Sequence, residues 1–249
     1  MEGAIVSIGP LCGLLMSGWL GIYGAILAFK LVPNSCPMTA TYIAWAFLPL
    51  AYNTWLGLCA WPSVDVTVDL HEKLPVADHL CRVMCAFQLC NVVTCCLAPK
   101  YRRPENIVHH LMTAALCYLS ITTPFALVYT VFFVGVAELT SIPSTVVDAH
   151  RYLDDVRSAA PAHVVLTARA LFALTFIGIR VIYWPYVSAL FWIQCLQTLR
   201  DGSARSVPVL TFFLVCNVIL TSMQLYWGRK ILLIVRREYV ARSHHAHRL

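Results

Sequence analysis

The sequence predicts an all-α integral membrane protein with seven transmembrane helices. Of its 249 residues, 59% are hydrophobic and 12% are charged, whereas ordinary soluble domains carry about 25% charged residues. The apolar runs are also too many and too long for the core of a soluble protein. A soluble globular enzyme is therefore excluded, and the short connections between the runs leave no room for a domain outside the membrane.

Seven apolar segments can be drawn along the chain. They cover residues 11–31, 39–61, 77–98, 106–121, 123–143, 164–199 and 207–228. The fourth and fifth lie so close together that residues 120–124, which include Pro124, predict a tight turn between two antiparallel spans. The sixth would be about 54 Å long as one straight helix, against a hydrocarbon core of about 30 Å. We therefore expect Pro185 to break or kink it.

The basic residues indicate how the chain crosses the membrane. With a lumenal or extracellular amino terminus, 12 of the 18 Lys and Arg residues lie on the cytosolic side and three on the other side. This asymmetry favours seven spans with a cytosolic carboxyl terminus. The net charge of +6 then acts as an orientation signal, and we expect no nucleic-acid partner.

Cysteine usage indicates neither a redox motif nor a metal centre. Nearly all of the 11 Cys residues lie within the spans, and no CxxC pair occurs. We expect them to act as small apolar side chains and expect no metal site.

Polar residues recur at three- and four-residue steps within five of the spans, which places them on one stripe of each helix. Polar groups in hydrocarbon are costly, so they mark either a cavity or contacts between helices. We interpret these stripes as the lining of a polar or amphipathic cavity. The residues concerned are Asn106, His109 or His110, Thr113, Cys117 and Ser120; Asn217, Thr221, Gln224 and Gly228; Gln88, Asn91 and Cys95; Glu138 and Ser141; and Arg169 and Arg180.

The depth of these residues suggests a cluster at the cytosolic mouth of the cavity. His109 or His110, Glu138 and Arg169 would share one level, with Arg180 about 16 Å deeper. A carboxylate can orient a His that acts as a general base or nucleophile, although the same pair can be an inert hydrogen bond. We take His109, His110 and Glu138 as candidate catalytic residues. The candidate substrate-binding residues are Asn91, Thr113, Arg169, Arg180, Asn217 and Gln224.

Four stretches together resemble the TLC domain, the membrane domain shared by translocating-chain-associating membrane protein, ceramide synthases and the neuronal ceroid-lipofuscinosis membrane protein. They are Asn-Ile-Val-His-His-Leu-Met-Thr-Ala-Ala at 106–115, the preceding helix at 87–93, Ala-Glu-Leu-Thr-Ser-Ile-Pro at 137–143, and the closing helices at 180–185 and 224–227. The resemblance divides the chain into an amino-terminal span and linker (1–38), the domain (39–235) and a basic, His-containing cytosolic tail (236–249).

The resemblance implies six helices around a central lipid-accommodating cavity, plus one extra amino-terminal span. In ceramide synthases it implies acyl transfer from acyl-CoA, the co-substrate, by His residues of the Lag motif. His109 and His110 match the first His pair, but the His-Asp-rich part is replaced by Val-Ala-Glu-Leu-Thr-Ser-Ile-Pro-Ser. In this the chain resembles the less characterised TLC-domain proteins.

Two classes of function follow from these observations. The first is a protein of lipid metabolism or homeostasis, expected in the endoplasmic reticulum, that binds membrane lipids or fatty acyl chains. It would be either an acyltransferase-like enzyme or a non-enzymatic lipid-binding regulator. The alternative is a seven-helix receptor or transporter. No cofactor is expected, and a homodimer remains open.

Overall fold

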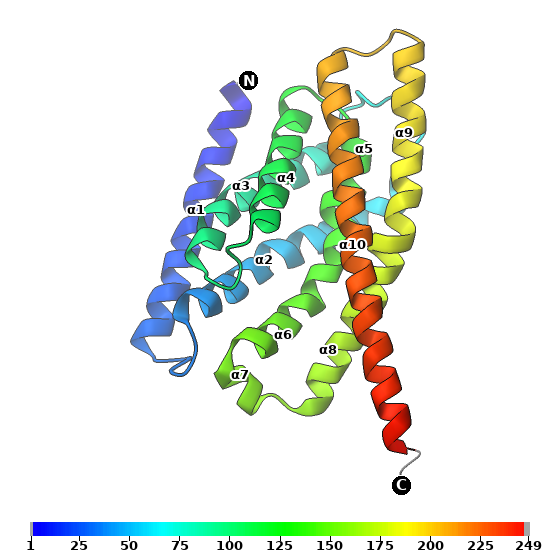
Figure 1. The fold of residues 1–249 in the computed structure, drawn as a ribbon. Coiled ribbons are helices and arrows are strands. Elements are labelled where there is room, and N and C mark those ends of the chain that lie inside the picture. The colour runs from blue at the N-terminus through cyan, green and yellow to red at the C-terminus, as the bar shows by residue number, and fades with distance from the viewer. Residues whose placement is uncertain (1, 247–249) are drawn as a thin grey trace.

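All regular structure in residues 2–246, which the computed structural model describes, is helical (Figure 1). Five long helices are continuous: α1 (Glu2–Ala28), α2 (Pro37–Ala60), α3 (Pro75–Leu97), α4 (Pro104–Thr122) and α10 (Val207–Ala246). Two composite helices lie between α4 and α10 in the chain. The first joins α5 (Leu127–Thr130), η2 (Val131–Gly135), η3 (Val136–Thr140) and α6 (Ser141–Tyr152), and the second joins α8 (Ala162–Thr175), η4 (Phe176–Tyr183) and α9 (Trp184–Arg200). The short helices η1 (Trp61–Ser63) and α7 (Asp154–Ala159) lie in connections.

The all-α membrane fold predicted from the sequence is confirmed. In the described part of the chain, six helices are long and apolar enough to cross a membrane: residues 8–28, 37–63, 75–97, 127–152, 162–200 and 207–237. The helix α4 is the seventh long helix, with 19 residues. It is less apolar than the six because it carries Glu105, Asn106 and both candidate His residues.

Of the two alternatives predicted for Pro185, a break in the sixth span is wrong, since the helix runs without interruption from Ala162 to Arg200. Pro185 lies in the first turn of α9, directly after the π-helical segment η4. In an uninterrupted helix a proline leaves one preceding carbonyl without its N–H partner, and here it does so beside a π-helical segment, where the regular α-helical hydrogen bonding is already interrupted. The fifth span likewise continues to Tyr152, past the expected end at residue 143.

The two largest groups of buried apolar side chains hold most of the bundle together. One joins α1, α2, α3 and α4, with Trp45, Phe87 and Leu80 among its buried members. The other joins the α5–η3 segment to α9 and α10, with Phe132 and Phe191 at its centre. The first composite helix contributes to both groups, so it forms the axis between the two halves of the bundle.

The connection between α2 and α3 covers one end of the second group. The amide of Ala126 donates to the carbonyl of Leu70 over 2.7 Å, and Gln194 Nε2 donates to the carbonyls of Val66 and Val68. Tyr129 in turn donates its hydroxyl to Gln194 Oε1 over 2.9 Å. These bonds fix residues 66–70 across the end of the bundle.

Polar contacts also tie together the connections at the opposite end. Ser35 and Asn34, in the α1–α2 connection, donate to the carboxylate of Asp155, and these bonds hold the pKa of Asp155 below its usual range. Tyr101, before α4, donates its hydroxyl to Asp148 over 2.9 Å. Burial and the nearby Asp148 carboxylate raise the pKa of Tyr101, so the hydroxyl stays a donor at neutral pH.

The start of α1 and the end of α10 lie at opposite ends of the molecule (Figure 1). The α1–α2, α3–α4 and α6–α8 connections, which carry Lys30, Arg103 and Arg157 among other basic residues, lie on the side where α10 ends. The helix α10 includes most of the predicted tail, 236–249, and residues 247–249 lie outside the described part. The assignment of the basic side to the cytosol stays a prediction.

One close backbone approach gives a test of this packing. A Cβ atom added at Gly57 on α2 would lie 2.5 Å from the Cα of Gly135 in η2, and neither backbone can yield. We expect Gly57→Ala to cost about 1 to 3 kcal/mol through overpacking and to lower the thermal unfolding midpoint of the detergent-solubilised protein. Gly21→Ala on α1, where nothing lies within 4 Å, is the control and should leave that midpoint unchanged or slightly raised. Equal midpoints for the two variants would contradict the close crossing of α2 and η2.

Candidate functional site

A pocket lies inside the bundle, between α4, the first composite helix, the η4–α9 segment and α10. Its empty volume is about 700 Å³, which includes the open space at its mouth. The lining residues are His109, Thr113, Leu116, Cys117, Ser120, Ala126, Tyr129, Thr130, Phe133, Val134, Glu138, Arg180, Trp184, Phe191, Phe213, Asn217 and Leu220.

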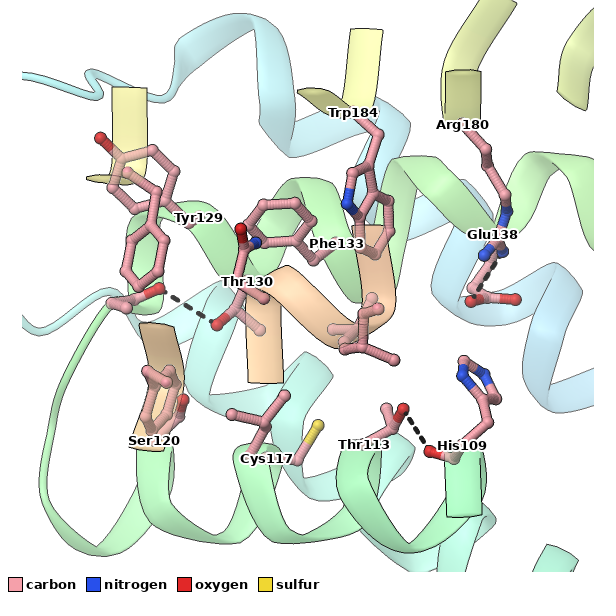
Figure 2. A pocket seen from close by; sticks show the side chains of 17 residues that line it. His109, Thr113, Cys117, Ser120, Tyr129, Thr130, Phe133, Glu138, Arg180 and Trp184 are labelled. Carbon is pink, nitrogen blue, oxygen red and sulfur yellow. Dashed lines mark hydrogen bonds and ion pairs between the residues drawn. The ribbon is translucent and has the colours of Figure 1, made fainter. Parts of the chain in front are cut away.

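The pocket is elongated and its two ends differ in chemistry. His109 and Ser120 both line it from α4, and 11 residues of helix separate them by about 16 Å. Figure 2 shows His109, Glu138 and Arg180 together at one end, with Ser120 and Tyr129 at the other. Apolar and aromatic side chains, such as Leu116 and Phe133, line much of the length between them.

A buried ion pair forms the charged end of the pocket. Arg180 donates from Nη2 to Glu138 Oε1 over 3.2 Å, and the two side chains are 8% and 12% exposed. Arg180 also donates from Nε to Thr140 over 2.7 Å and from Nη1 to Gln224 over 3.5 Å. The other Glu138 oxygen accepts from Ser141 over 2.6 Å. Three further side chains, Thr140, Gln224 and Ser141, therefore fix the guanidinium and the carboxylate in place.

Irregular helical geometry positions both charged residues. Arg180 lies within the π-helical η4, and Glu138 lies in the 3-10 segment η3, directly after the π-helical η2. π-Helical turns are rare and occur frequently at functional sites, because the added residue rotates the side chains that follow it. Both segments face the pocket.

The two adjacent His residues point in different directions. His109 lines the pocket, and its shielded Nδ1 has no hydrogen-bond partner. His110 lies against α3 instead, where its Nδ1 is 2.6 Å from Gln88 Oε1. The sequence left open which of the two faces the cavity, and the structure places His109 there.

The predicted cluster at the mouth of the cavity differs in its members from the observed one. Arg180 contacts Glu138 directly and so does not lie deeper than it. Arg169 is exposed on α8 and is not among the pocket-lining residues. The two carboxylate oxygens of Glu138 accept from Arg180 and Ser141. Their hydrogen bonds therefore do not go to a His, as the predicted orienting role required. The 11-residue spacing of the two Arg residues suggested one shared face, but the π-helical turns of η4 change their relative direction.

The remaining candidate binding residues occupy three kinds of position. Thr113 and Asn217 line the pocket. Gln224 is fully buried behind it and accepts from Arg180. Asn91 is buried on α3, where it donates to Gln88, so it belongs with His110 and not with the pocket.

Sequence reasoning did not identify the aromatic walls of the pocket. The pocket is lined by five aromatic residues, Tyr129, Phe133, Trp184, Phe191 and Phe213. In a membrane span the sequence alone does not distinguish an aromatic residue that faces a cavity from one that faces lipid. Thr140, which accepts from Arg180, was also missed, although it lies two residues after Glu138. Among the described residues no group of three His, Cys, Asp or Glu side chains is arranged to hold a metal ion.

Fold and pocket together define a polytopic helical membrane protein with a pocket inside its helix bundle. Comparison with protein-family models is more specific, since the TLC domain (TRAM_LAG1_CLN8) matches residues 36–233. The chain therefore belongs to the TLC domain family, as the sequence resemblance indicated. Comparisons with curated proteins and with solved structures found no match.

The buried ion pair gives a prediction about stability. Arg180→Met leaves the Glu138 carboxylate buried without its counter-ion, and removal of one partner of such a pair costs about 3 to 5 kcal/mol. We expect a clearly lower thermal midpoint for this variant in detergent. Adding Glu138→Gln should restore much of the loss, because the double variant buries no charge. An additive loss in the double variant would show that the two side chains are not coupled.

Proposed function

We propose that this TLC-domain protein binds a lipid or a fatty acyl chain in the pocket and acts in lipid metabolism or homeostasis. The observation that carries the proposal is the pocket itself, which joins a charged and polar end to a largely apolar, aromatic remainder. An amphipathic ligand matches this division, with its head at His109 and its chain directed toward Ser120. Membership of the TLC domain family supports this function over a receptor or transporter.

The distribution of basic residues supports a cytosolic position for the polar end. His109 lies five residues after the start of α4, and that start follows the basic residues Lys100, Arg102 and Arg103. The ligand head would then face the cytosol and its chain would point toward the lumen. An endoplasmic reticulum membrane, with the amino terminus lumenal, is the location we propose with this orientation.

Acyl transfer is a second candidate, favoured by the unpaired imidazole of His109 in the pocket. In that reaction an imidazole nitrogen would attack the thioester carbonyl of acyl-CoA, and coenzyme A would leave as the thiol with the imidazole proton. An acceptor hydroxyl or amine would then take the acyl group and return a proton to the ring. Glu138 would act by holding Arg180 near the carbonyl oxygen and not as a direct partner of the His, because its own bonds go to Arg180 and Ser141.

Filling the pocket tests the binding proposal. Cys117 lies midway along the pocket and is 2% exposed, so Cys117→Phe should place a ring where the chain would lie. We expect the amount of copurifying lipid, measured by mass spectrometry, to fall severalfold. Leu111→Phe on the exposed face of the same helix, at 49% exposure, is the matched control. Equal lipid content in both folded variants would refute binding at this position.

A second experiment separates the enzyme from the non-enzymatic binder. After incubation with acyl-CoA, intact-mass and peptide analysis should show an acyl adduct on His109 if the ring is the nucleophile, and His109→Ala should abolish it. His110→Ala is the control, because His110 faces Gln88 on α3 and should leave the adduct in place. An adduct on neither residue, with lipid still bound, would favour a lipid-binding regulator.

A further inference from the structure

We propose that the pocket selects a single-chain lipid whose head is uncharged, a hydroxyl or a carbonyl group, and that His109 forms the hydrogen bond to it. This inference rests on the proposed function and narrows its ligand to one chemical class. It excludes fatty carboxylates, lysophospholipids and long-chain amines as the preferred occupants.

The first support is the charge balance of the polar end. The charged residues that line the pocket are Glu138 and Arg180, and they neutralise one another at 3.2 Å. Both are buried. A ligand carboxylate or phosphate would add a second anion beside one guanidinium, and an ammonium would add a second cation beside one carboxylate. In a desolvated site either addition leaves a net buried charge, which is unfavourable.

The second support is that each nitrogen of the Arg180 guanidinium and each carboxylate oxygen of Glu138 already has a protein partner. Both Glu138 oxygens accept protein donors, and the Nε, Nη1 and Nη2 atoms of Arg180 each donate to a protein acceptor. Phe176 and Trp184 also lie about 6 Å from the guanidinium carbon, at 6.0 and 5.9 Å to their ring centroids. Two of the five N–H groups of the guanidinium remain, so a charged ligand head would share Arg180 with these protein partners and could not take the place of Glu138 without leaving a buried carboxylate unpaired.

The third support is the state of the other polar groups at this end. Thr113 donates its hydroxyl to the carbonyl of His109 over 2.9 Å. The imidazole of His109 has a shielded Nδ1 without a partner, and the side chain extends toward the ion pair (Figure 2). A buried polar atom without a partner is unfavourable, so a ligand that supplies one is stabilised. An imidazole can donate or accept according to its tautomer, which suits a hydroxyl as well as a carbonyl.

The size of the pocket favours one chain. The polar end and Ser120 are about 16 Å apart along α4, and the volume of about 700 Å³ includes the space at the opening. Further along, Asn217 is occupied by Trp192 and Ser188, and Tyr129 by Gln194. These bonds leave a channel beyond His109 that suits hydrocarbon more than a second polar group.

The test is a competition between three ligands of equal chain length: cetyl alcohol, palmitate and cetylamine. Each competes with a photoreactive long-chain alcohol for the purified full-length protein in neutral detergent, and labelling is read by mass spectrometry. We expect cetyl alcohol to compete at least tenfold more strongly than palmitate or cetylamine. His109→Phe, which keeps a ring, should weaken the alcohol about tenfold, as expected for the loss of one hydrogen bond.

A charge variant tests the cause of the selectivity. Glu138→Gln keeps the shape of the side chain and leaves Arg180 without a counter-ion, so it should raise the affinity for palmitate above that for the alcohol. Leu111→Phe, exposed on the same helix as His109, should keep the wild-type order.

The outcomes separate the two proposals. Stronger competition by palmitate or cetylamine in the wild-type protein overturns the uncharged head and leaves lipid binding intact. Failure of the photoreactive alcohol and of all three ligands to bind overturns the proposed lipid site and, with it, this inference. An unchanged ligand order in folded Glu138→Gln would contradict the role given to the ion pair.

Discussion

Arg180 and Glu138 place two charges in helices that are otherwise apolar enough to cross a membrane, so they must meet if the chain is to be stable. An isolated charge at the centre of a bilayer is expensive, by about 2.5 to 3.5 kcal/mol even on insertion scales. Their contact at 3.2 Å therefore fixes how the two composite helices lie against each other. Gln224 extends this contact to α10. The positions of three of the four pocket walls depend on this one interaction.

The irregular turns follow from the same constraint. In a regular α-helix the direction of a side chain is set by its spacing from its neighbours, and the neighbours of Glu138 and Arg180 must also bury the aromatic residues of the second core. The π-helical segments η2 and η4 add residues to the turns beside the pair, which changes the direction of the side chains that follow. The glycine contact between α2 and η2 lets the first composite helix pass close to its neighbour at this point.

Composition and periodicity predicted the helical class, the membrane location and the approximate spans, because long apolar runs leave few alternatives in a bilayer. The stripe rule also found Thr113, Glu138, Arg180 and Asn217 as residues of interest, since polar groups in spans must face a partner. It failed for Arg169 and for the relative depth of Arg180, because its fixed periodicity does not hold through a π-helical segment. Pairing was not predictable either. Glu138 pairs with Arg180 and not with His109 because of how three different helices pack. The pattern of polar residues along one helix carries no information about that packing.

The short length of α4 explains how the polar end of the pocket can be buried and yet lie near an end of the bundle. Glu138 and Arg180 come from the middle of spans of 26 and 39 residues, whereas His109 is only about 8 Å from the start of its helix. His109 nevertheless lies at the same depth as Glu138 and Arg180, because α4 begins further inside the bundle than its neighbours do. Figure 1 shows this, since the α3–α4 connection lies nearer the middle of the molecule than the α1–α2 and α6–α8 connections. That connection is held there by Tyr101, which contacts Tyr42 and Tyr152 and donates to Asp148. A ligand head at His109 would therefore lie about one and a half helical turns from the basic residues that precede α4. A second, water-soluble reactant could approach it there while the hydrocarbon chain of the ligand remains inside the bundle.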